Sequence, residues 1–201
     1  MIKAVIFDYG NVIHKWDNDI FLRELVKLSG KDYDYIYDLI FNTGMHSRLE
    51  IGKISPSSFF EKIIKDLGID INKNNFFDLF SRKLFQEIKT TFSLIKKLKK
   101  NYKVALLSNT NKIDFDYVMK KSELFPLFDS VTLSFEVGYK KPEKQIYLDA
   151  LKKLNLKPDE CVYIDDIKEY SDAASRLGLH GIHYTSHEKL VKELKKLKIK
   201  F

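Results

Sequence analysis

The stretch AVIFDYGNVI, residues 4–13, decides the fold because it places a carboxylate directly after an apolar segment. Residues 4–7 form a continuous apolar run with the length and β-branched content of a strand covered on both faces. Gly10 and Asn11 are turn residues, so the strand is expected to end just before Asp8. In open α/β sheets, ligands bind at the carboxyl edge, where the strand order reverses. The stretch therefore predicts a buried strand whose tip carries Asp8 at a ligand-binding edge.

Amphipathic segments and short apolar runs alternate from Thr91 to the end of the chain. The expected helices are 92–100, 113–121, 143–154, 171–177 and 187–197, and the expected strands are 104–107, 130–134, 162–164 and 181–184. Pro142 suits the start of the third of these helices, and Gly178 suits the end of the fourth. This alternation predicts an α/β fold with a doubly wound parallel sheet and helices on both faces.

The segment between Trp16 and Gln86 has a helical pattern, with no strand of comparable strength. Apolar side chains recur at helical spacing in residues 21–28, 59–67 and 76–84, and we interpret their aromatic members as core packing. An insertion of this length has the size of a small second domain. We therefore predict a core domain of residues 1–15 and 87–201 and a helical cap domain of residues 16–86.

The charge balance is basic, with 35 Lys and Arg against 28 Asp and Glu and a formal net charge of +7. The lysines follow amphipathic helices, as in residues 95–100, where they are expected to form solvated faces. Because basic and aromatic residues do not interleave as in a base-stacking platform, we expect no nucleic-acid partner.

The single cysteine, Cys161, rules out a disulfide within the chain and fits a reducing compartment. The chain has no signal-like N-terminus and no apolar run of about 18 residues, so no membrane association is expected. These features predict a cytoplasmic protein, either a monomer or a homodimer.

Polar side chains follow the other predicted strands as well. Residues 108–110 follow the second strand, Asp165 and Asp166 follow the fourth, and Lys140 and Lys141 lie in the loop after the third. Because the carboxyl ends of parallel strands meet at one edge, we expect these side chains to share a cleft with the first aspartate. Each signal alone has an ordinary explanation as a helix cap, a polar turn or a surface charge.

A cluster of carboxylates requires raised pKa values or a bound cation, and hard oxygen ligands favour Mg²⁺. A lysine with hydroxyl and amide donors opposite the metal would neutralise the oxygens of a transferring phosphoryl group. An aspartate would remain to act as a nucleophile and form an acyl phosphate. This combination predicts phosphoryl-transfer chemistry.

Four motifs in chain order resemble those of the haloacid dehalogenase-like hydrolases. They are VIFDYGNV, LLSNTN, Lys141 within GYKKPE, and VYIDD. The resemblance covers essentially the whole chain, implies a Rossmann-like core, and matches the helical insertion to the C1 caps of that superfamily. FDYGNVI, LSNTN and KKPEKQIY are most similar to the branch that contains bacterial glucose-1-phosphate phosphatase.

The resemblance implies a role for each motif residue. Asp8 would be the nucleophile, with Lys141 and Ser108 as its catalytic partners. Asp8, Asp166 and the Gly10 carbonyl would contact magnesium, with Asp165 beside them. The phosphoryl group would be held by Gly10, Asn11, Ser108, Asn109 and Lys141.

The sequence departs from the family pattern at two positions. Most phosphatases of the superfamily have an aspartate at the position of Gly10, where it protonates the leaving oxygen. The resembling branch also lacks this aspartate. The enzyme would then favour leaving groups that depart easily, or take a proton from the cap or from water. His14 and His46 are candidate donors, with surface histidines of no special role as the alternative. Tyr170 replaces an asparagine of the branch, which would alter the support of its loop.

Substrate choice is expected in the cap. MHSRLEIGKIS, residues 45–55, reads as a turn between cap helices and resembles the family's substrate-specificity loop. Arg48 or Glu50 could bond sugar hydroxyls, although an exposed salt bridge explains them equally well.

These expectations combine into a magnesium-dependent phosphatase for a small phosphate ester, first a sugar phosphate, with an aspartyl-phosphate intermediate. A 2-haloacid dehalogenase is one alternative, but its chemistry needs no metal and leaves the Asp165 and Asp166 pair unexplained. A non-catalytic phosphate- or metal-binding regulatory protein that lost turnover with the acid at position 10 is the other.

Overall fold

The computed structural model describes the chain from Met1 to Phe201, apart from the side chain of Phe85. Its main sheet is parallel, with the strand order β5-β4-β1-β6-β7. The strands are β1 (Ala4–Phe7), β4 (Lys103–Ser108), β5 (Ser130–Leu133), β6 (Cys161–Asp165) and β7 (His180–His183). The predicted α/β fold class is confirmed, and each strand expected from the sequence is present.

Strand β1 lies at the centre of this sheet. Its last residue, Phe7, pairs with Leu106 of β4 on one side and with Ile164 of β6 on the other. The chain adds β4 and β5 on the first side and then crosses β1 to add β6 and β7 on the second. The strand order therefore reverses beside β1, and Asp8 follows β1 at that switch point.

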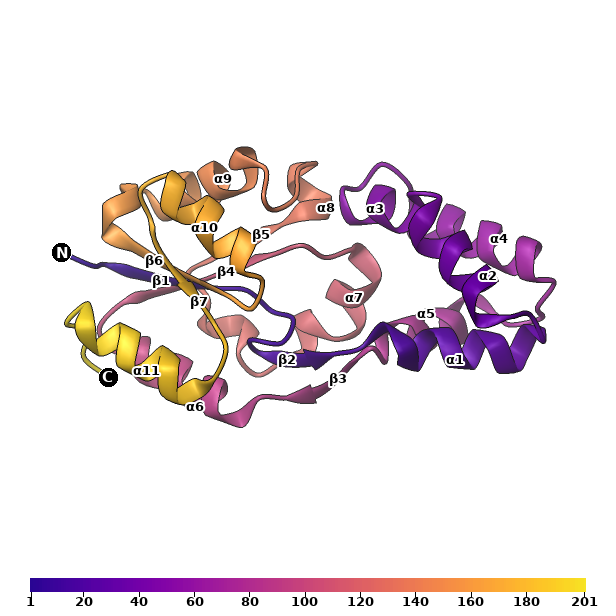
Figure 1. Cartoon of the computed structure of the whole chain (residues 1–201), viewed down its shortest axis with the longest axis horizontal. Helices are drawn as coiled ribbons and strands as arrows, with labels where there is room; N and C mark the ends of the chain where they lie inside the picture. The colour runs from indigo at the N-terminus through magenta and orange to yellow at the C-terminus, as the bar shows by residue number, and fades with distance from the viewer.

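Helices cover both faces of the sheet (Figure 1). Val5 and Phe7 pack with α6 (Lys89–Leu98) and α11 (His187–Lys196) on one face. Ala4 and Ile6 pack with α9 (Lys144–Leu154) and α10 (Lys168–Arg176) on the other. Burial on both faces explains why β1 is apolar at every position.

Two details of the core differ from the sequence prediction. The helix expected over 113–121 ends early, because α7 spans Lys112–Tyr117 and a 3₁₀ turn follows at Met119–Lys121. Pro142 precedes α9 by two residues and so lies outside its first turn. The short elements that remain in the core are 3₁₀ turns at Phe125–Leu127 and Pro158–Glu160 and the helix α8 (Ser134–Val137).

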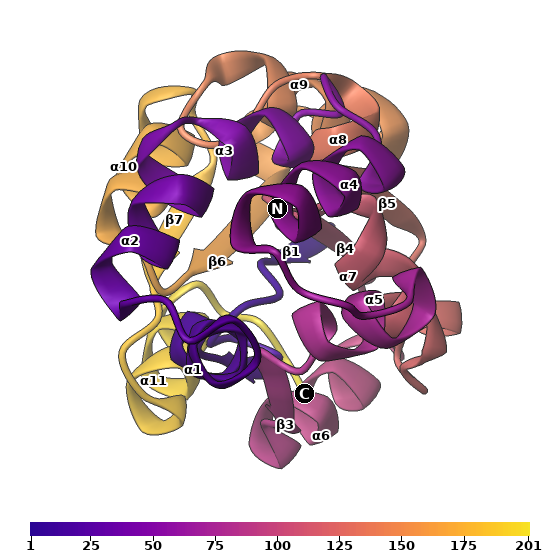
Figure 2. The same cartoon turned by 90° about the vertical axis from the view of Figure 1, so that its right-hand side faces the viewer.

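The insertion between β1 and β4 forms a separate layer of helices over the carboxyl edge of the sheet (Figures 1 and 2). It contains α1 (Asn18–Ser29), α2 (Tyr33–Tyr37), a π-helical turn (Asp38–Asn42), α3 (Met45–Glu50), α4 (Pro56–Leu67) and α5 (Lys73–Ser81). The side chains of Asp17, Ser55 and Asn72 cap α1, α4 and α5, which fixes where these helices begin. The helical aromatics pack in the interior as predicted, for example Phe59 and Phe76, which are fully buried.

A two-stranded antiparallel ribbon connects this helical layer to the sheet. It pairs β2 (His14–Trp16) with β3 (Leu84–Glu87). The domain boundaries expected after residues 15 and 86 fall inside this ribbon. These strands have no clear sequence signal and were not predicted, because each is short and β2 is exposed at two of its three positions.

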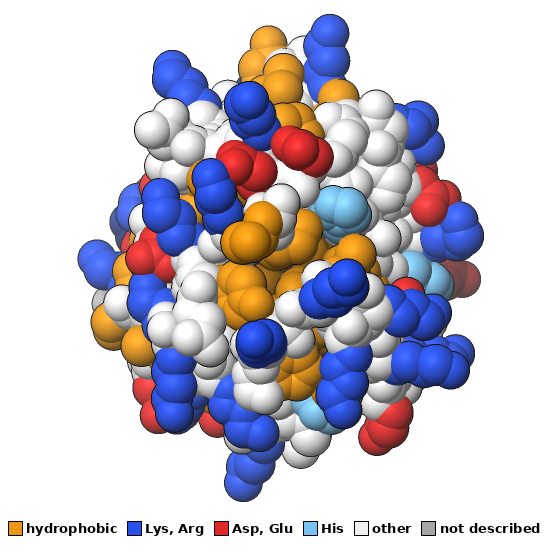
Figure 3. Space-filling view, turned by 90° about the vertical axis from the view of Figure 1, so that its left-hand side faces the viewer, with side chains coloured by type: hydrophobic (Ala, Val, Ile, Leu, Met, Phe, Trp, Pro, Cys, Tyr) orange, Lys and Arg blue, Asp and Glu red, His pale blue; other side chains and the backbone are white. Residues whose placement is uncertain are grey.

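The face of the molecule opposite the helical insertion carries many basic side chains (Figure 3). They are interspersed with acidic and uncharged side chains and surround a central group of apolar ones. Within the part of the chain that the structure describes, no helix has the length and apolar character needed to cross a bilayer.

Candidate active site

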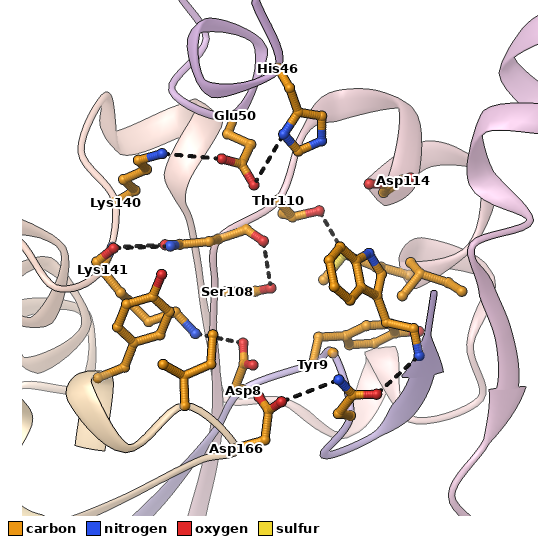
Figure 4. A pocket seen from close by; sticks show the side chains of 18 residues that line it. Asp8, Tyr9, His46, Glu50, Ser108, Thr110, Asp114, Lys140, Lys141 and Asp166 are labelled. Atoms are coloured by element: carbon orange, nitrogen blue, oxygen red, sulfur yellow. Dashed lines mark hydrogen bonds and ion pairs between the residues drawn. The ribbon is translucent and has the colours of Figure 1, made fainter. Parts of the chain in front are cut away.

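A cavity of about 220 Å³ lies between the carboxyl edge of the sheet and the inserted helices (Figure 4). The loops after β1, β4, α8 and β6 line it from the core, and α3 lines it from the insertion. Side chains far apart in the sequence therefore meet in one place, as the strand-end argument predicts. Asp8, Ser108, Lys141 and Asp166 all line this cavity.

Lys141 forms the centre of a buried ionic network. Its Nζ lies 2.7 Å from Oδ1 of Asp8 and 2.7 Å from Oδ2 of Asp165. Asp165 also accepts hydrogen bonds from the Tyr163 hydroxyl and, at 2.8 Å, from the Ile167 backbone N–H. The side chains of Lys141 and Asp165 are 1% and 0% exposed. Asp165 therefore holds the lysine in position from inside the core.

Burial and charge oppose each other in this network. Burial raises the pKa of Asp8 to about 7, although the Lys141 charge acts to lower it. Burial alone would lower the pKa of Lys141, but the charges of Asp8 and Asp165 raise it above its usual value. Lys141 therefore remains a cation and provides a fixed positive charge beside Asp8.

Asp8, Asp165 and Asp166 form an acidic cluster, because each offers a carboxylate oxygen within 4.8 Å of the others. Asn11 donates a hydrogen bond of 3.2 Å to Oδ2 of Asp166 and so orients it. Gly10 lines the same cavity. Hard oxygen donors of this kind suit Mg²⁺, and one lysine does not balance three carboxylates. The residues present therefore fit a divalent cation.

The loop after β4 contributes Ser108, Asn109 and Thr110 to the cavity. The Asn109 side chain donates to the Lys141 carbonyl at 3.1 Å and accepts from the Lys141 backbone N–H at 2.8 Å. Both polar groups of this amide are therefore used to hold the lysine loop. Ser108 is 3% exposed, and its hydroxyl makes a 3.4 Å contact with the Asn109 carbonyl.

The insertion contributes Glu50 and His46 to the cavity, both from α3. Lys140 of the core contacts the same helix, with its Nζ 2.9 Å from the Ser47 hydroxyl and 3.4 Å from Oε2 of Glu50. Arg48 is exposed on the same helix and does not line the cavity. The structure therefore supports Glu50 rather than Arg48 as a contact to a ligand. Residues 45–50 are helical, so the turn expected over residues 45–55 is limited to residues 51–54.

Comparison with known proteins agrees with this geometry. A family model described as haloacid dehalogenase-like hydrolase matches residues 2–178. The chain belongs to this family.

Two curated relatives are phosphatases by name. The D-ribitol-5-phosphate phosphatase of Bacteroides thetaiotaomicron is 30% identical over 176 residues, covering 83% of this chain and 84% of the relative. The sesquiterpene phosphatase astK of Aspergillus oryzae is 26% identical over 201 residues, covering 97% of this chain and 96% of the relative. A solved HAD family enzyme of Bacteroides thetaiotaomicron, in complex with magnesium and inorganic phosphate, has a TM-score of 0.82 and 25% identity, covering 94% of this chain and 99% of that one.

Neither candidate histidine of this haloacid dehalogenase-like hydrolase is a surface residue, because His14 is buried and the His46 side chain is only 12% exposed. His14 stacks on the Tyr9 ring, with 4.9 Å between ring centroids, and does not line the cavity. Burial lowers the pKa of His14 to about 4 and that of His46 to about 3. Each imidazole is therefore neutral near pH 7 and lacks the readily lost proton of an imidazolium acid.

The low pKa of His46 predicts a specific acid sensitivity. His46 takes up a proton near pH 6.5 in the unfolded chain but only near pH 3 in the folded chain. Its contribution to the free energy of unfolding is therefore fully present above about pH 6.5 and is lost as the pH falls. Phenylalanine at this position would still pack against Phe41 and Phe80. The substitution His46→Phe therefore removes the pH-dependent contribution of the imidazole to stability. Between about pH 7 and 4.5, urea unfolding of H46F should lose about 2 kcal/mol less stability than wild type. Equal losses would contradict this assignment.

A buried ion pair that the sequence does not indicate joins the insertion to the core. Lys83 lies between α5 and β3, and its Nζ is 2.8 Å from Oδ1 of Asp114 on α7. The side chains of the two residues are 2% and 6% exposed. A lysine in a polar stretch gives no sequence signal for such a pair, because its partner is 31 residues away.

Tyr170, expected to alter the support of its loop, lies against Lys141. Its ring centroid is 5.1 Å from Nζ of Lys141, and its carbonyl accepts a hydrogen bond from the Tyr147 hydroxyl. An aromatic face provides a weak attraction for the ammonium group. Tyr170 therefore contacts Lys141 as a wall of the cavity.

Proposed function

We propose that this protein is a magnesium-dependent phosphatase that hydrolyses a small phosphate ester through a phosphorylated Asp8. The observation that carries this proposal is the position of Lys141 between Asp8 and Asp165, in one cavity with Asp166. A buried cation beside a carboxylate nucleophile can stabilise the negative oxygens of a transferring phosphoryl group. The phosphatase names of the two curated relatives support the same reaction class.

In this mechanism Asp8 attacks phosphorus and forms an acyl phosphate, while the bond from phosphorus to the leaving oxygen breaks. Lys141 and Ser108 orient the phosphoryl oxygens, and Asn109 holds the Lys141 loop in place. Water then attacks the acyl phosphate and restores the Asp8 carboxylate. Asp8, Asp166 and the Gly10 carbonyl would hold Mg²⁺, with Asp165 beside them. The ion would supply positive charge to the phosphoryl oxygens.

We propose that residues 16–86 act as a cap domain over the core formed by residues 1–15 and 87–201. The inserted helices have their own apolar cluster, which supports movement of this layer as a unit. A cap that closes over the cavity would exclude water during phosphoryl transfer to Asp8.

The substrate is proposed to be a phosphorylated polyol or sugar. Glu50 and Lys140 place a carboxylate and an ammonium group at the cap side of the cavity, where they can bond hydroxyl groups. The name of the D-ribitol-5-phosphate phosphatase supports this class. The neighbouring Trp16 and Ile167 also give the cavity an apolar wall, so the substrate screen should include phosphorylated isoprenoid alcohols.

The reaction is tested with 4-nitrophenyl phosphate and a panel of metabolite phosphates, with added magnesium or with EDTA. Hydrolysis that requires magnesium supports the proposal, and hydrolysis that EDTA does not affect contradicts it. Halide release from a 2-halo acid would instead favour a dehalogenase. Phosphate-ester or metal binding without turnover on any substrate would favour a regulatory protein.

Magnesium should also stabilise the fold in the absence of substrate. A cation that binds the folded chain at one hundred times its Kd adds about 2.7 kcal/mol, or about 5–10 °C in Tm for a chain of this size. The increase should disappear in Asp166→Asn, which removes a carboxylate from the acidic cluster. Differential scanning calorimetry with magnesium or EDTA measures this effect. An equal increase in the D166N variant would contradict this site.

A further inference from the structure

We propose that Glu50 of the cap is the proton donor to the leaving oxygen, and that it recovers its proton from the water that cleaves the acyl phosphate. This assignment rests on the proposed phosphatase function. An alkoxide is a poor leaving group unless a positioned acid protonates it as the bond breaks. Gly10, the second residue after Asp8, has no side chain for this task.

Glu50 lies on the side of the cavity that the leaving oxygen must face. Figure 4 shows Asp8 at the core side and Glu50 at the cap side, with Ser108 between them. In phosphoryl transfer the attacking and leaving oxygens are roughly in line across phosphorus. A leaving group displaced by Asp8 therefore departs toward the cap, where Glu50 provides a carboxyl group.

The surroundings of Glu50 favour proton exchange. Among the described residues, its carboxyl oxygens make no hydrogen bond or ion pair shorter than the 3.4 Å contact to Lys140, with His46 Nδ1 at 3.8 Å. The side chain is 19% exposed, and burial raises the pKa of Glu50 despite the nearby charges of Lys140 and Lys83. Asp114 of α7 also acts to raise this pKa. Glu50 thus combines a raised pKa with an oxygen that no close partner occupies.

The other acidic side chains of the cavity are less suited to this role. Asp114 uses both oxygens, accepting from Lys83 at 2.8 Å and from Asn111 at 2.6 Å. Asp166 belongs to the acidic cluster beside Asp8. The phenol of Tyr170 has a pKa raised by burial, so it is a weaker acid than free tyrosine.

Two contacts with α8 hold Glu50 in position. The Ser134 hydroxyl donates a hydrogen bond of 2.6 Å to the Glu50 carbonyl. Gly52 lies so close to the core that a Cβ built on it would be 2.3 Å from the Phe135 carbonyl oxygen. The C-terminal end of α3 therefore packs against the core, and these contacts hold the backbone that carries the Glu50 side chain.

The proposed step conserves atoms, electrons and protons. The Asp8 oxygen bonds to phosphorus, the electron pair of the breaking bond stays on the leaving oxygen, and the Glu50 proton converts that oxygen into an alcohol. The Glu50 carboxylate is then stabilised by the Lys140 ammonium group. In the second half, water adds its oxygen to phosphorus and gives a proton to Glu50. Asp8 is released as a carboxylate.

The test is the dependence of kcat/KM on the leaving group in Glu50→Gln. Because kcat/KM covers the steps through departure of the leaving group, slow cleavage of the acyl phosphate does not affect it. With 2,4-dinitrophenyl phosphate, whose leaving group needs no proton, the variant should remain within about threefold of wild type. With benzyl phosphate, kcat/KM should fall by about 100-fold. The alkaline decline of kcat/KM for benzyl phosphate should also disappear.

Glu61→Gln is the matched control, because Glu61 is an exposed carboxylate on α4. E61Q should match wild type with both substrates. An equal loss of E50Q activity on both esters, or no loss on benzyl phosphate, would overturn the assignment while the phosphatase function stands. If wild type with magnesium hydrolyses neither ester, the phosphatase proposal fails, and the Glu50 assignment fails with it.

Discussion

Replacing Asp8 with asparagine should reduce kcat/KM for 4-nitrophenyl phosphate by on the order of 10⁴-fold or more, because the amide cannot attack phosphorus. The fold should be retained, since asparagine keeps the shape of the side chain and Lys141 still pairs with Asp165 at 2.7 Å. Steady-state kinetics with magnesium measures the effect. Intact-protein mass spectrometry should detect a phosphorylated form in quenched wild type and none in D8N.

Asp70→Asn is the control, because Asp70 is an exposed carboxylate in a loop. It should keep wild-type kinetics. A D8N variant that retains activity, while circular dichroism shows an unchanged fold, would rule out Asp8 as the nucleophile and with it the covalent mechanism.

Replacing Lys141 with methionine should impair both activity and stability. Without the ammonium group, the buried carboxylates of Asp8 and Asp165 face each other without their cation. Removing one partner of a buried ion pair typically lowers the free energy of unfolding by about 3–5 kcal/mol. The loss of a positive charge at the phosphoryl group should cost on the order of 10³-fold in kcat. Urea unfolding in EDTA and kinetics with magnesium measure the two effects separately.

Lys153→Met provides the comparison for an exposed pair. Lys153 lies 2.8 Å from Asp149 of the same helix, and its side chain is 37% exposed. Such surface pairs contribute about 0.3–0.5 kcal/mol, so K153M should be nearly as stable as wild type. If K141M and K153M lose the same stability, Lys141 is not the buried counter-ion that the structure shows.

The sheet and its functional edge could be predicted because their signals are local. A run such as residues 4–7 is apolar at every position only when both faces are covered, and the central strands β4 and β6 carry a comparable signal. Asp8 and Asp166 follow such runs directly, so their convergence follows from parallel topology alone. The loop after β5 indicated Lys140 and Lys141 together, and only the family resemblance selected Lys141.

The rest of the site depends on how the cap is oriented, which no local pattern records. Arg48 and Glu50 are two residues apart on a short helix, so one faces the cavity and the other faces solvent. His14 and His46 were candidate proton donors with surface positions as the alternative, and only the tertiary packing removes them from solvent. The Lys83 and Asp114 pair depends on the docking of two segments, and its partners have no common motif.

The Lys83 and Asp114 pair would also determine which motions of the proposed cap have a low free-energy cost. It joins the insertion to the core beside the β2–β3 ribbon, whereas α3 meets α8 on the other side of the cavity (Figure 1). Separating two buried charges costs free energy, so the proposed cap would open by keeping the pair intact and rotating about an axis near the ribbon. The contacts that would break in this rotation are those of α3, including the 3.4 Å contact between Lys140 and Glu50. Product release would then coincide with exposure of Glu50 to water, after the hydrolytic water has already returned its proton.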